Sequence, residues 1–364
     1  MELPSQPITP TTPTHPLSDN LLAPSSYQSP QQLPMQLHKG VYVPMPAFFH
    51  AADNDSIDIP ATQRHTARLM AAGVTGLVVH GSNGEAVHLS QRERRLMIEA
   101  VADTVRHETD SHAPVPIIAG CSAQSVRETL ELCREARDAG ATHALVLPPG
   151  YYRGLMDSEA IVGYFEHLAT HGALPIVIYN FPPAANGVDL DSDVILRLAA
   201  HPRIVGVKLT CGNTGKLARL VEGAPRVRGN TAAGFVEFFI GGGSADFILQ
   251  GLVVGAHGTI SGFANLAPRA CVRIGELYEA GHIAEARALQ HEVAKADWLA
   301  IRYGFVGVKA AMPIFHGPTE VSCAVPRLPF EQLDPQGRAV GEIREGMAGA
   351  LEIERKLATE VLAS

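Results

Sequence analysis

The sequence predicts an α/β fold, a (β/α)8 TIM barrel with additional C-terminal helices. From residue 39 onward, short apolar segments alternate with amphipathic helical segments. Eight of the apolar segments have the character of strands, which is the number that closes such a barrel. The rival fold, a doubly wound open sheet, carries a G-x-G-x-x-G fingerprint after its first strand, and this chain has none there. A barrel needs about 250 residues, so a chain of 364 residues leaves room for further segments.

The predicted strands are short and largely apolar on both faces, as strands buried on both faces are. Their alternation with helical segments matches the (β/α)8 pattern. In chain order they span residues 41–46, 76–80, 115–119, 143–147, 175–179, 204–208, 227–231 and 258–260.

The predicted helices between the strands include residues 90–106, 122–139 and 158–171. Each begins at a serine, and Ser90 with Glu93 forms a capping-box pattern. The second and third end next to Gly140 and Gly172, which suit the end of a helix. After Asn265 the chain becomes mostly helical, over residues 266–278, 283–302 and 338–362.

The chain divides into three parts by composition. Residues 1–38 hold eight of the 26 prolines together with many Ser, Thr and Gln residues. Such a segment buries too little apolar surface to offset its ordering entropy, and it is predicted to be a disordered Pro/Ser-rich tail. Residues 39–265 form the predicted catalytic barrel, and residues 266–364 the C-terminal helical segment packed on it. Because a mitochondrial presequence is rich in Arg and the tail has no Lys or Arg before Lys39, we expect a cytoplasmic protein, with a mitochondrial one as the alternative.

Composition excludes several classes of protein. The net charge of −8 argues against a nucleic-acid partner. The apolar runs are far shorter than the roughly 20 residues of a membrane span, so no membrane partner is expected. The five cysteines are scattered, without a C-x-x-C pair, which disfavours a zinc site and a disulfide scaffold. His80 and His88 are the histidines near a strand-end motif, and no carboxylate cluster adjoins them, so no metal is expected.

Lys208 closes the apolar run of residues 204–207 at the end of the sixth predicted strand. Active sites of these barrels lie at the carboxyl ends of the strands. A lysine in the barrel mouth loses solvation, which disfavours its ammonium form, and a neutral amine attacks carbonyl carbon. The alternative is a strand-end lysine whose amine reaches solvent. Lys309 follows a similar apolar run but comes after the eighth strand, and we interpret it as a helical or loop lysine.

Tyr179 ends the preceding predicted strand, 29 residues upstream of Lys208. Adjacent barrel strands would bring its hydroxyl near that amine, where a phenol can shuttle protons during imine formation. The alternative is a core aromatic residue whose hydroxyl is hydrogen-bonded.

Two glycine-containing runs suggest places where the backbone meets a ligand. Residues 81–84, Gly-Ser-Asn-Gly, form a strand-to-helix turn whose amides and serine hydroxyl could cradle a carboxylate. Residues 241–244, Gly-Gly-Gly-Ser, offer a second such approach. An ordinary turn and a flexible loop are the alternatives.

Three motifs in order resemble those of the dihydrodipicolinate synthase / N-acetylneuraminate lyase family. They are Gly-Ser-Asn-Gly-Glu at residues 81–85, Tyr-Asn-Phe-Pro at 179–182 and Gly-Val-Lys at 206–208. The resemblance covers roughly residues 40–320. It implies a (β/α)8 barrel with C-terminal helices, a homotetramer, and chemistry without a metal or cofactor, through a covalent imine between a lysine and pyruvate or another 2-oxo acid.

The resemblance also implies catalytic roles for individual residues. Lys208 would be the Schiff-base nucleophile, and Tyr179 the proton relay. The family's relay tyrosine from a neighbouring subunit falls at Tyr151 or Tyr152, and we favour Tyr151.

Substrate-binding roles follow from the same resemblance. Ser82 and the backbone of Asn83 would hold the pyruvate carboxylate, while Gly243 and Ile260 match positions that line the pocket through their backbone. Thr210 comes two residues after the lysine, so strand alternation would put it on the same inward face, where it would be a second hydroxyl contact.

One departure from the family pattern narrows the substrate. Dihydrodipicolinate synthases carry an Arg shortly after the tyrosine motif to grip a second carboxylate, and here that stretch, residues 183–187, is Pro-Ala-Ala-Asn-Gly. The chain looks more like 4-hydroxy-2-oxoglutarate aldolases. It is more similar still, through residues 187–193 and 206–213, to fungal aldolases that act on 2-keto-3-deoxy sugar acids.

The predicted function is therefore that of a Schiff-base aldolase, an aldehyde-lyase of carbohydrate catabolism. It would cleave a 2-oxo-3-deoxy-4-hydroxy acid reversibly to pyruvate and an aldehyde such as glyceraldehyde. The alternatives are a 4-hydroxy-2-oxoglutarate aldolase that releases glyoxylate, a condensing enzyme like dihydrodipicolinate synthase, and a catalytically dead barrel that only binds.

Overall fold

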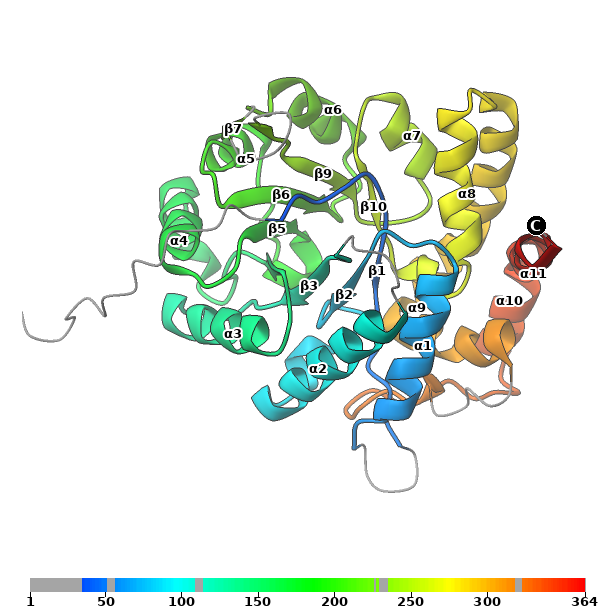
Figure 1. The fold of residues 1–364 in the computed structure, drawn as a ribbon. Coiled ribbons are helices and arrows are strands. Elements are labelled where there is room, and N and C mark those ends of the chain that lie inside the picture. The colour runs from blue at the N-terminus through cyan, green and yellow to red at the C-terminus, as the bar shows by residue number, and fades with distance from the viewer. Residues whose placement is uncertain are drawn as a thin grey trace, which may run out of the picture. The chain divides into compact units, whose positions relative to one another are not determined.

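The computed structural model describes residues 35–50, 56–108, 114–225, 227–228, 235–317 and 323–363. Its centre is a closed eight-stranded barrel in which every neighbouring pair of strands is parallel (Figure 1). The predicted (β/α)8 barrel with additional C-terminal helices is thereby confirmed. In their order around the barrel the strands are β1 (Gly40–Pro44), β10 (Gly258–Ile260), β9 (Phe239–Gly242), β6 (Ile204–Leu209), β5 (Ile176–Asn180), β4 (His143–Val146), β3 (Ile117–Gly120) and β2 (Gly76–Val79).

Helices surround the barrel and cover the outer face of its strands (Figure 1). Several begin at a side-chain cap: Ser125 accepts a hydrogen bond from the amide of Glu128, and Asp157 from that of Ala160. One helix follows each of the eight barrel strands. In chain order these helices are α1 (Ile59–Ala71), α2 (Gln91–Glu108), α3 (Val126–Asp138), α4 (Ser158–His171), α5 (Ser192–Ala199), α6 (Thr214–Gly223), α7 (Ile248–Val253) and α8 (Pro268–Glu279).

The C-terminal segment adds α9 (Ile283–His316), α10 (Arg338–Gly346) and α11 (Ala348–Ala363). The prediction ended the first of these helices at residue 302, but α9 continues past a kink at Gly304, whose φ of 60° and ψ of −156° interrupt the helix. The single predicted helix over residues 338–362 is two helices that meet at Met347. Lys309 lies in α9, in agreement with its interpretation as a helical lysine.

The prediction of the seventh strand at residues 227–231 is wrong. Val227–Arg228 (β7) pairs antiparallel with Phe235–Val236 (β8) in a separate ribbon, and the seventh barrel strand is β9. Glycine weakens the strand signal of β9, yet Gly241 and Gly242 are required there. A Cβ atom at either position would lie 2.6 or 2.7 Å from the ring of Phe239 or Phe247.

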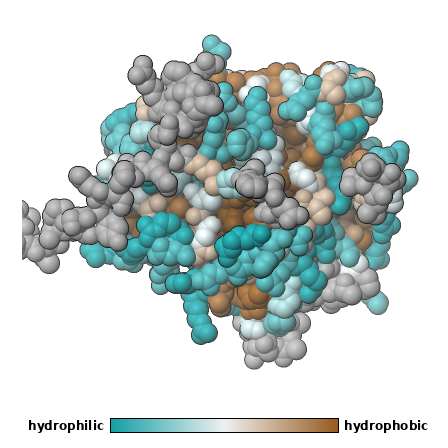
Figure 2. Space-filling model, in the orientation of Figure 1, coloured by the Kyte–Doolittle hydropathy of each residue, from teal (hydrophilic) through white to brown (hydrophobic). Residues whose placement is uncertain are grey.

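The predicted tail falls almost wholly outside the described residues, and its disorder stays a prediction. Within residues 35–38 the chain already contacts the barrel. Leu37 is buried with the side chains of the barrel interior, and the backbone carbonyl of Met35 lies 2.9 Å from His143 Nε2. Hydrophilic residues cover much of the face drawn in Figure 2, with apolar residues visible between them. No helix within the described ranges is both long and apolar enough to cross a membrane.

A buried ion pair joins the C-terminal helices to the turn after β2. Glu85, with a left-handed φ of 49°, ends this turn, and its carboxylate accepts a hydrogen bond from Lys309 Nζ. Neither side chain is exposed to solvent. The same carboxylate accepts from the backbone amide of Arg327 at 2.9 Å, and Lys309 also donates to the Val325 carbonyl at 2.7 Å. Burial lowers the pKa of Lys309 to about 8, against the opposing effect of Glu85.

Lys309→Met is expected to destabilise the protein strongly, by about 3–5 kcal/mol, because it leaves the Glu85 carboxylate buried without its cation. The measurement is the free energy of unfolding of the full chain in urea. The double variant Lys309→Met/Glu85→Gln removes both charges and should recover a large part of the loss. Equal stability of the single variant and the wild type would contradict this account.

Candidate active site

Lys208 and Tyr179 face each other across neighbouring strands at the carboxyl end of the barrel. They are directly paired in the register of β5 and β6. Lys208 Nζ lies 4.4 Å from the centre of the Tyr179 ring. Lys208 is 3% exposed and Tyr179 is 4% exposed, which rules out a strand-end lysine that reaches bulk solvent. The structure therefore places an amine and a phenol together in a sheltered position.

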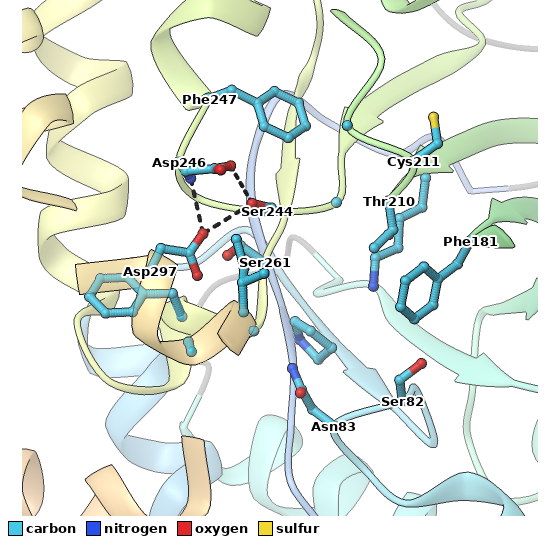
Figure 3. Close-up of a pocket in the computed structure, with 18 of the residues that line it drawn as sticks. Ser82, Asn83, Phe181, Thr210, Cys211, Ser244, Asp246, Phe247, Ser261 and Asp297 are labelled. Carbon is cyan, nitrogen blue, oxygen red and sulfur yellow. Dashed lines mark hydrogen bonds between the residues drawn. The ribbon is translucent and has the colours of Figure 1, made fainter. Parts of the chain in front are cut away.

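Both residues line a cavity of about 640 Å³ at this end of the barrel. Figure 3 shows the side chains around it. Six of the eight site residues predicted from the sequence line the cavity: Lys208, Tyr179, Ser82, Asn83, Thr210 and Gly243. Ile260 instead packs in the barrel interior, with no exposed surface, and Tyr151 is exposed at the protein surface.

The turn after β2 brings Ser82 and Asn83 to the cavity. Ser82 Oγ lies 3.2 Å from the hydroxyl of Tyr179, so the two hydroxyls share a hydrogen bond. Asn83 packs so closely against Gly262 that a Cβ atom there would lie 2.0 Å from its Nδ2. The ion pair of Glu85 holds the end of this turn, which fixes the position of both side chains.

Gly243 and Thr210 fit against each other in the lining of the same cavity. A Cβ atom at Gly243 would lie 2.1 Å from Thr210 Oγ1, so this position admits only glycine without rearrangement. The backbone amide of Gly243 donates to the carbonyl of Leu209 at 2.9 Å. The predicted backbone approach at Gly243 thus reflects close packing with the end of β6.

The loop after β5 is held by a small polar network. Asn180 donates through Nδ2 to Asp189 at 2.8 Å and accepts from the amide of Leu190 at 3.0 Å. Lys216, which is 3% exposed, donates to the same carboxylate of Asp189.

Among the described residues that line the cavity, Lys208 is the single cationic side chain.

The cavity also contains carboxyl groups that the sequence did not reveal. Asp297, on α9, is 3% exposed, and its Oδ2 accepts hydrogen bonds from the amides of Ala245 and Asp246, at 2.7 and 3.0 Å. Ser244 Oγ lies 3.0 Å from the same atom and also contacts Asp246 Oδ1 (Figure 3). Burial, reinforced by the charge of Asp246, raises the pKa of Asp297 to about 7. Asp297 lies within an amphipathic helix, and no local sequence pattern shows that it faces a cavity whose other residues come from distant parts of the chain.

The two histidines considered for metal binding do not form a cluster with carboxylates at the cavity. Burial lowers the pKa of His80 to about 3, with a smaller effect from Arg94, so its imidazole stays neutral. His88 Nδ1 lies 3.2 Å from Glu85 Oε2, within the turn. Across the described part of the chain, no group of three or more His, Cys, Asp or Glu side chains is arranged to hold a metal ion.

Comparison with known proteins agrees with this geometry. The dihydrodipicolinate synthetase family matches residues 38–339. A protein of Emericella nidulans named "Probable 4-hydroxy-2-oxoglutarate aldolase, mitochondrial" is 46% identical over 88% of this chain and 97% of its own. The L-threo-3-deoxy-hexylosonate aldolase of Hypocrea jecorina is 41% identical over 89% and 99%.

A solved structure shows the same fold. A dihydrodipicolinate synthase family protein from Coccidioides immitis superposes with a TM-score of 0.76, at 34% identity, over 89% of this chain and 99% of its own. The two relatives above are named as aldolases. The resemblance carried by the three sequence motifs is confirmed, and the chain belongs to the dihydrodipicolinate synthetase family.

Proposed function

We propose that the protein is a class I aldolase that cleaves a 2-oxo-3-deoxy-4-hydroxy acid of the 2-keto-3-deoxy-hexonate type reversibly to pyruvate and an aldehyde such as glyceraldehyde. The buried pairing of Lys208 with Tyr179 carries this proposal. The names of the relatives, two of them aldolases at 41% identity or more, support it.

In this reaction Lys208 attacks the C2 carbonyl through its unprotonated amine, and water leaves to give a protonated imine. The imine draws electrons from the C3–C4 bond. That bond breaks as the C4 hydroxyl loses its proton and becomes the aldehyde, and the electron pair stays on C3 as an enamine. The enamine takes a proton at C3, and water then releases pyruvate and restores Lys208. No electron acceptor or cofactor is needed to balance these steps.

Tyr179 is the proposed proton relay in this reaction. Its ring lies beside Lys208, and its hydroxyl shares a hydrogen bond with Ser82. A proton taken from the carbinolamine or the C4 hydroxyl can therefore pass to the phenol and on to the serine. Ser82 and the backbone of Asn83 are the proposed partners of the pyruvate carboxylate, and Thr210 of a substrate hydroxyl.

The rival enzymes differ in what they require at the far end of the cavity. A dihydrodipicolinate synthase-like condensation needs a cation for a second carboxylate, and the described lining has Lys208 alone. A 4-hydroxy-2-oxoglutarate aldolase remains the second candidate because the relative at 46% identity bears that name. A catalytically dead barrel is disfavoured by the intact lysine and tyrosine.

We also propose a homotetramer in which Tyr151 reaches the active site of a neighbouring subunit. Tyr151 is 75% exposed and Tyr152 is 68% exposed, with their ring centres 4.9 Å apart. A second, mostly apolar cavity of about 560 Å³ shares Ser82, Tyr179 and Phe181 with the first. Large exposed aromatic residues are enriched at protein interfaces, which supports this proposal.

The cellular compartment and the tail remain predictions. The composition of residues 1–38 favours the cytoplasm, whereas the printed name of the relative from Emericella nidulans places that protein in mitochondria. A role in carbohydrate catabolism follows from the proposed substrate.

Treatment of the full chain with pyruvate and borohydride should add one reduced pyruvyl group, measured as intact mass, because the imine on Lys208 is trapped as a stable amine. Lys208→Ala should gain no mass. Lys216→Met is the matched control, since Lys216 is equally buried but pairs with Asp189, and it should still form the adduct. An adduct that survives Lys208→Ala, or none in the wild type, would refute the Schiff-base mechanism.

Tyr179→Phe should lower kcat for aldol cleavage by about 10²–10⁴-fold, because the proton relay is lost. Tyr164→Phe is the control, because that tyrosine is also buried but does not line the cavity, and its hydroxyl lies 2.9 Å from Thr129 Oγ1. The kcat of this variant should stay near that of the wild type. Unchanged kcat in Tyr179→Phe would remove this residue from the proton path.

Co-expression of Lys208→Ala with Tyr151→Phe subunits tests the shared site. Each variant alone should have little activity, whereas mixed oligomers should regain some. In them a wild-type Lys208 from one subunit meets a wild-type Tyr151 from its neighbour. The same co-expression with Tyr152→Phe subunits in place of Tyr151→Phe subunits identifies which tyrosine reaches the neighbouring active site. Failure of the mixtures to regain activity, with tetramers confirmed by sedimentation, would show that each site is built within one chain.

A further inference from the structure

We propose that Asp246 and Asp297, bridged by Ser244, form a selectivity element that accepts an uncharged polyhydroxyl chain at the distal end of the substrate and excludes a second carboxylate. This inference rests on the proposed aldolase function and specifies the substrate class of the same cavity. It concerns the end of the substrate that leaves as the aldehyde.

The element lies across the cavity from the proposed carboxylate site. Figure 3 shows Ser82 and Asn83 on one side and Ser244, Asp246 and Asp297 on another. All of these residues line the same cavity as Lys208. A substrate joined to Lys208 through C2, with its C1 carboxylate against the turn after β2, therefore extends its remaining carbons toward the two aspartates.

The three side chains are fixed in place before any ligand binds. Asp297 accepts hydrogen bonds from the backbone amides of Ala245 and Asp246, and these bonds hold the loop after β9 against α9. Ser244 Oγ contacts both carboxyl groups, yet a hydroxyl has one proton to donate. The single proton of Ser244 is therefore shared between two carboxyl oxygens, which leaves both carboxyl groups able to accept a further hydrogen bond from a ligand. Burial and the neighbouring charge of Asp246 raise the pKa of Asp297 to about 7.

Hydroxyl groups without partners lie in the same cavity. Ser261 is fully buried, and neither its Oγ nor Thr210 Oγ1 has a hydrogen-bond partner among the described residues. Buried hydroxyls are normally satisfied, so these two are open to a polar partner outside the chain, such as a substrate hydroxyl. Together with the aspartates they offer both donors and acceptors, which suits a chain of substrate hydroxyls.

Charge separates the two candidate substrate classes. A substrate hydroxyl can donate to the anionic carboxyl pair in a charge-assisted hydrogen bond. A second substrate carboxylate would instead face that negative charge, and the described lining offers no cation apart from Lys208, which the imine occupies. The geometry thus favours a 2-oxo-3-deoxy-hexonate over 4-hydroxy-2-oxoglutarate.

The test compares kcat/KM for these two substrates in the full-length protein. The wild type should prefer the hexonate. Asp246→Asn should reduce the ratio of kcat/KM for the hexonate to kcat/KM for 4-hydroxy-2-oxoglutarate, the dianion, by about 10–100-fold. The hexonate should be cleaved less efficiently and the dianion more efficiently. Asp193→Asn, which removes the same charge at an exposed position on α5, should leave the ratio unchanged.

Ser261→Ala provides an independent variant that leaves the charges intact. It should weaken cleavage of the hexonate without improving cleavage of the dianion. Asp297→Asn keeps an oxygen for the two loop amides and should shift the ratio in the same direction as Asp246→Asn.

The pyruvate adduct is measured in every variant as a readout of the Schiff-base step. Absence of the adduct in the wild type would defeat the aldolase function itself. Normal adducts combined with a wild-type preference for the dianion, or with a ratio that neither aspartate variant shifts, would overturn the selectivity element and leave the aldolase function standing.

Discussion

The buried ion pair between Lys309 and Glu85 is the constraint on which the arrangement of the active site depends. It fixes the turn that presents Ser82 and Asn83 to the cavity. The cation comes from the C-terminal segment, more than two hundred residues away along the chain. A buried pair of this kind contributes little net stability beyond that of apolar packing, but it tolerates few alternative arrangements. The C-terminal helices are thus part of the site's construction.

One helix supports the cavity at two places. Before the kink at Gly304, α9 carries Asp297, which holds the loop after β9; after the kink it carries Lys309, which holds the turn after β2. The left-handed conformation at position 304 suits glycine, and it redirects the helix between these two contacts. The relative position of the two loops, and with it the shape of the cavity, therefore depends on the geometry of a single kinked helix.

Under the proposed function, one wall of the cavity carries the shared chemistry and the opposite wall selects the substrate. Lys208, Tyr179 and Ser82 are placed by the carboxyl ends of parallel strands and the turn after one of them, a position that the barrel topology dictates. The opposite wall is made by the loop after β9, which carries Asp246, and by α9, which carries Asp297. Loops of this kind vary without disturbing the barrel, so one reaction can serve different aldehydes.

The sequence alone was enough to predict the barrel, most of its strands and six residues that line the cavity, because strand periodicity and the motifs around Ser82, Tyr179 and Lys208 are local patterns. The sequence pattern missed β9 because glycine weakens a strand signal. Gly241 and Gly242 occur there because the rings of Phe239 and Phe247 leave no room for a Cβ atom. Tertiary structure alone placed Ile260 inside the barrel, and it alone brought Asp297 and Lys309 to the cavity and its turn. Such contacts join distant segments, and their energies depend on burial and partners that no local pattern records.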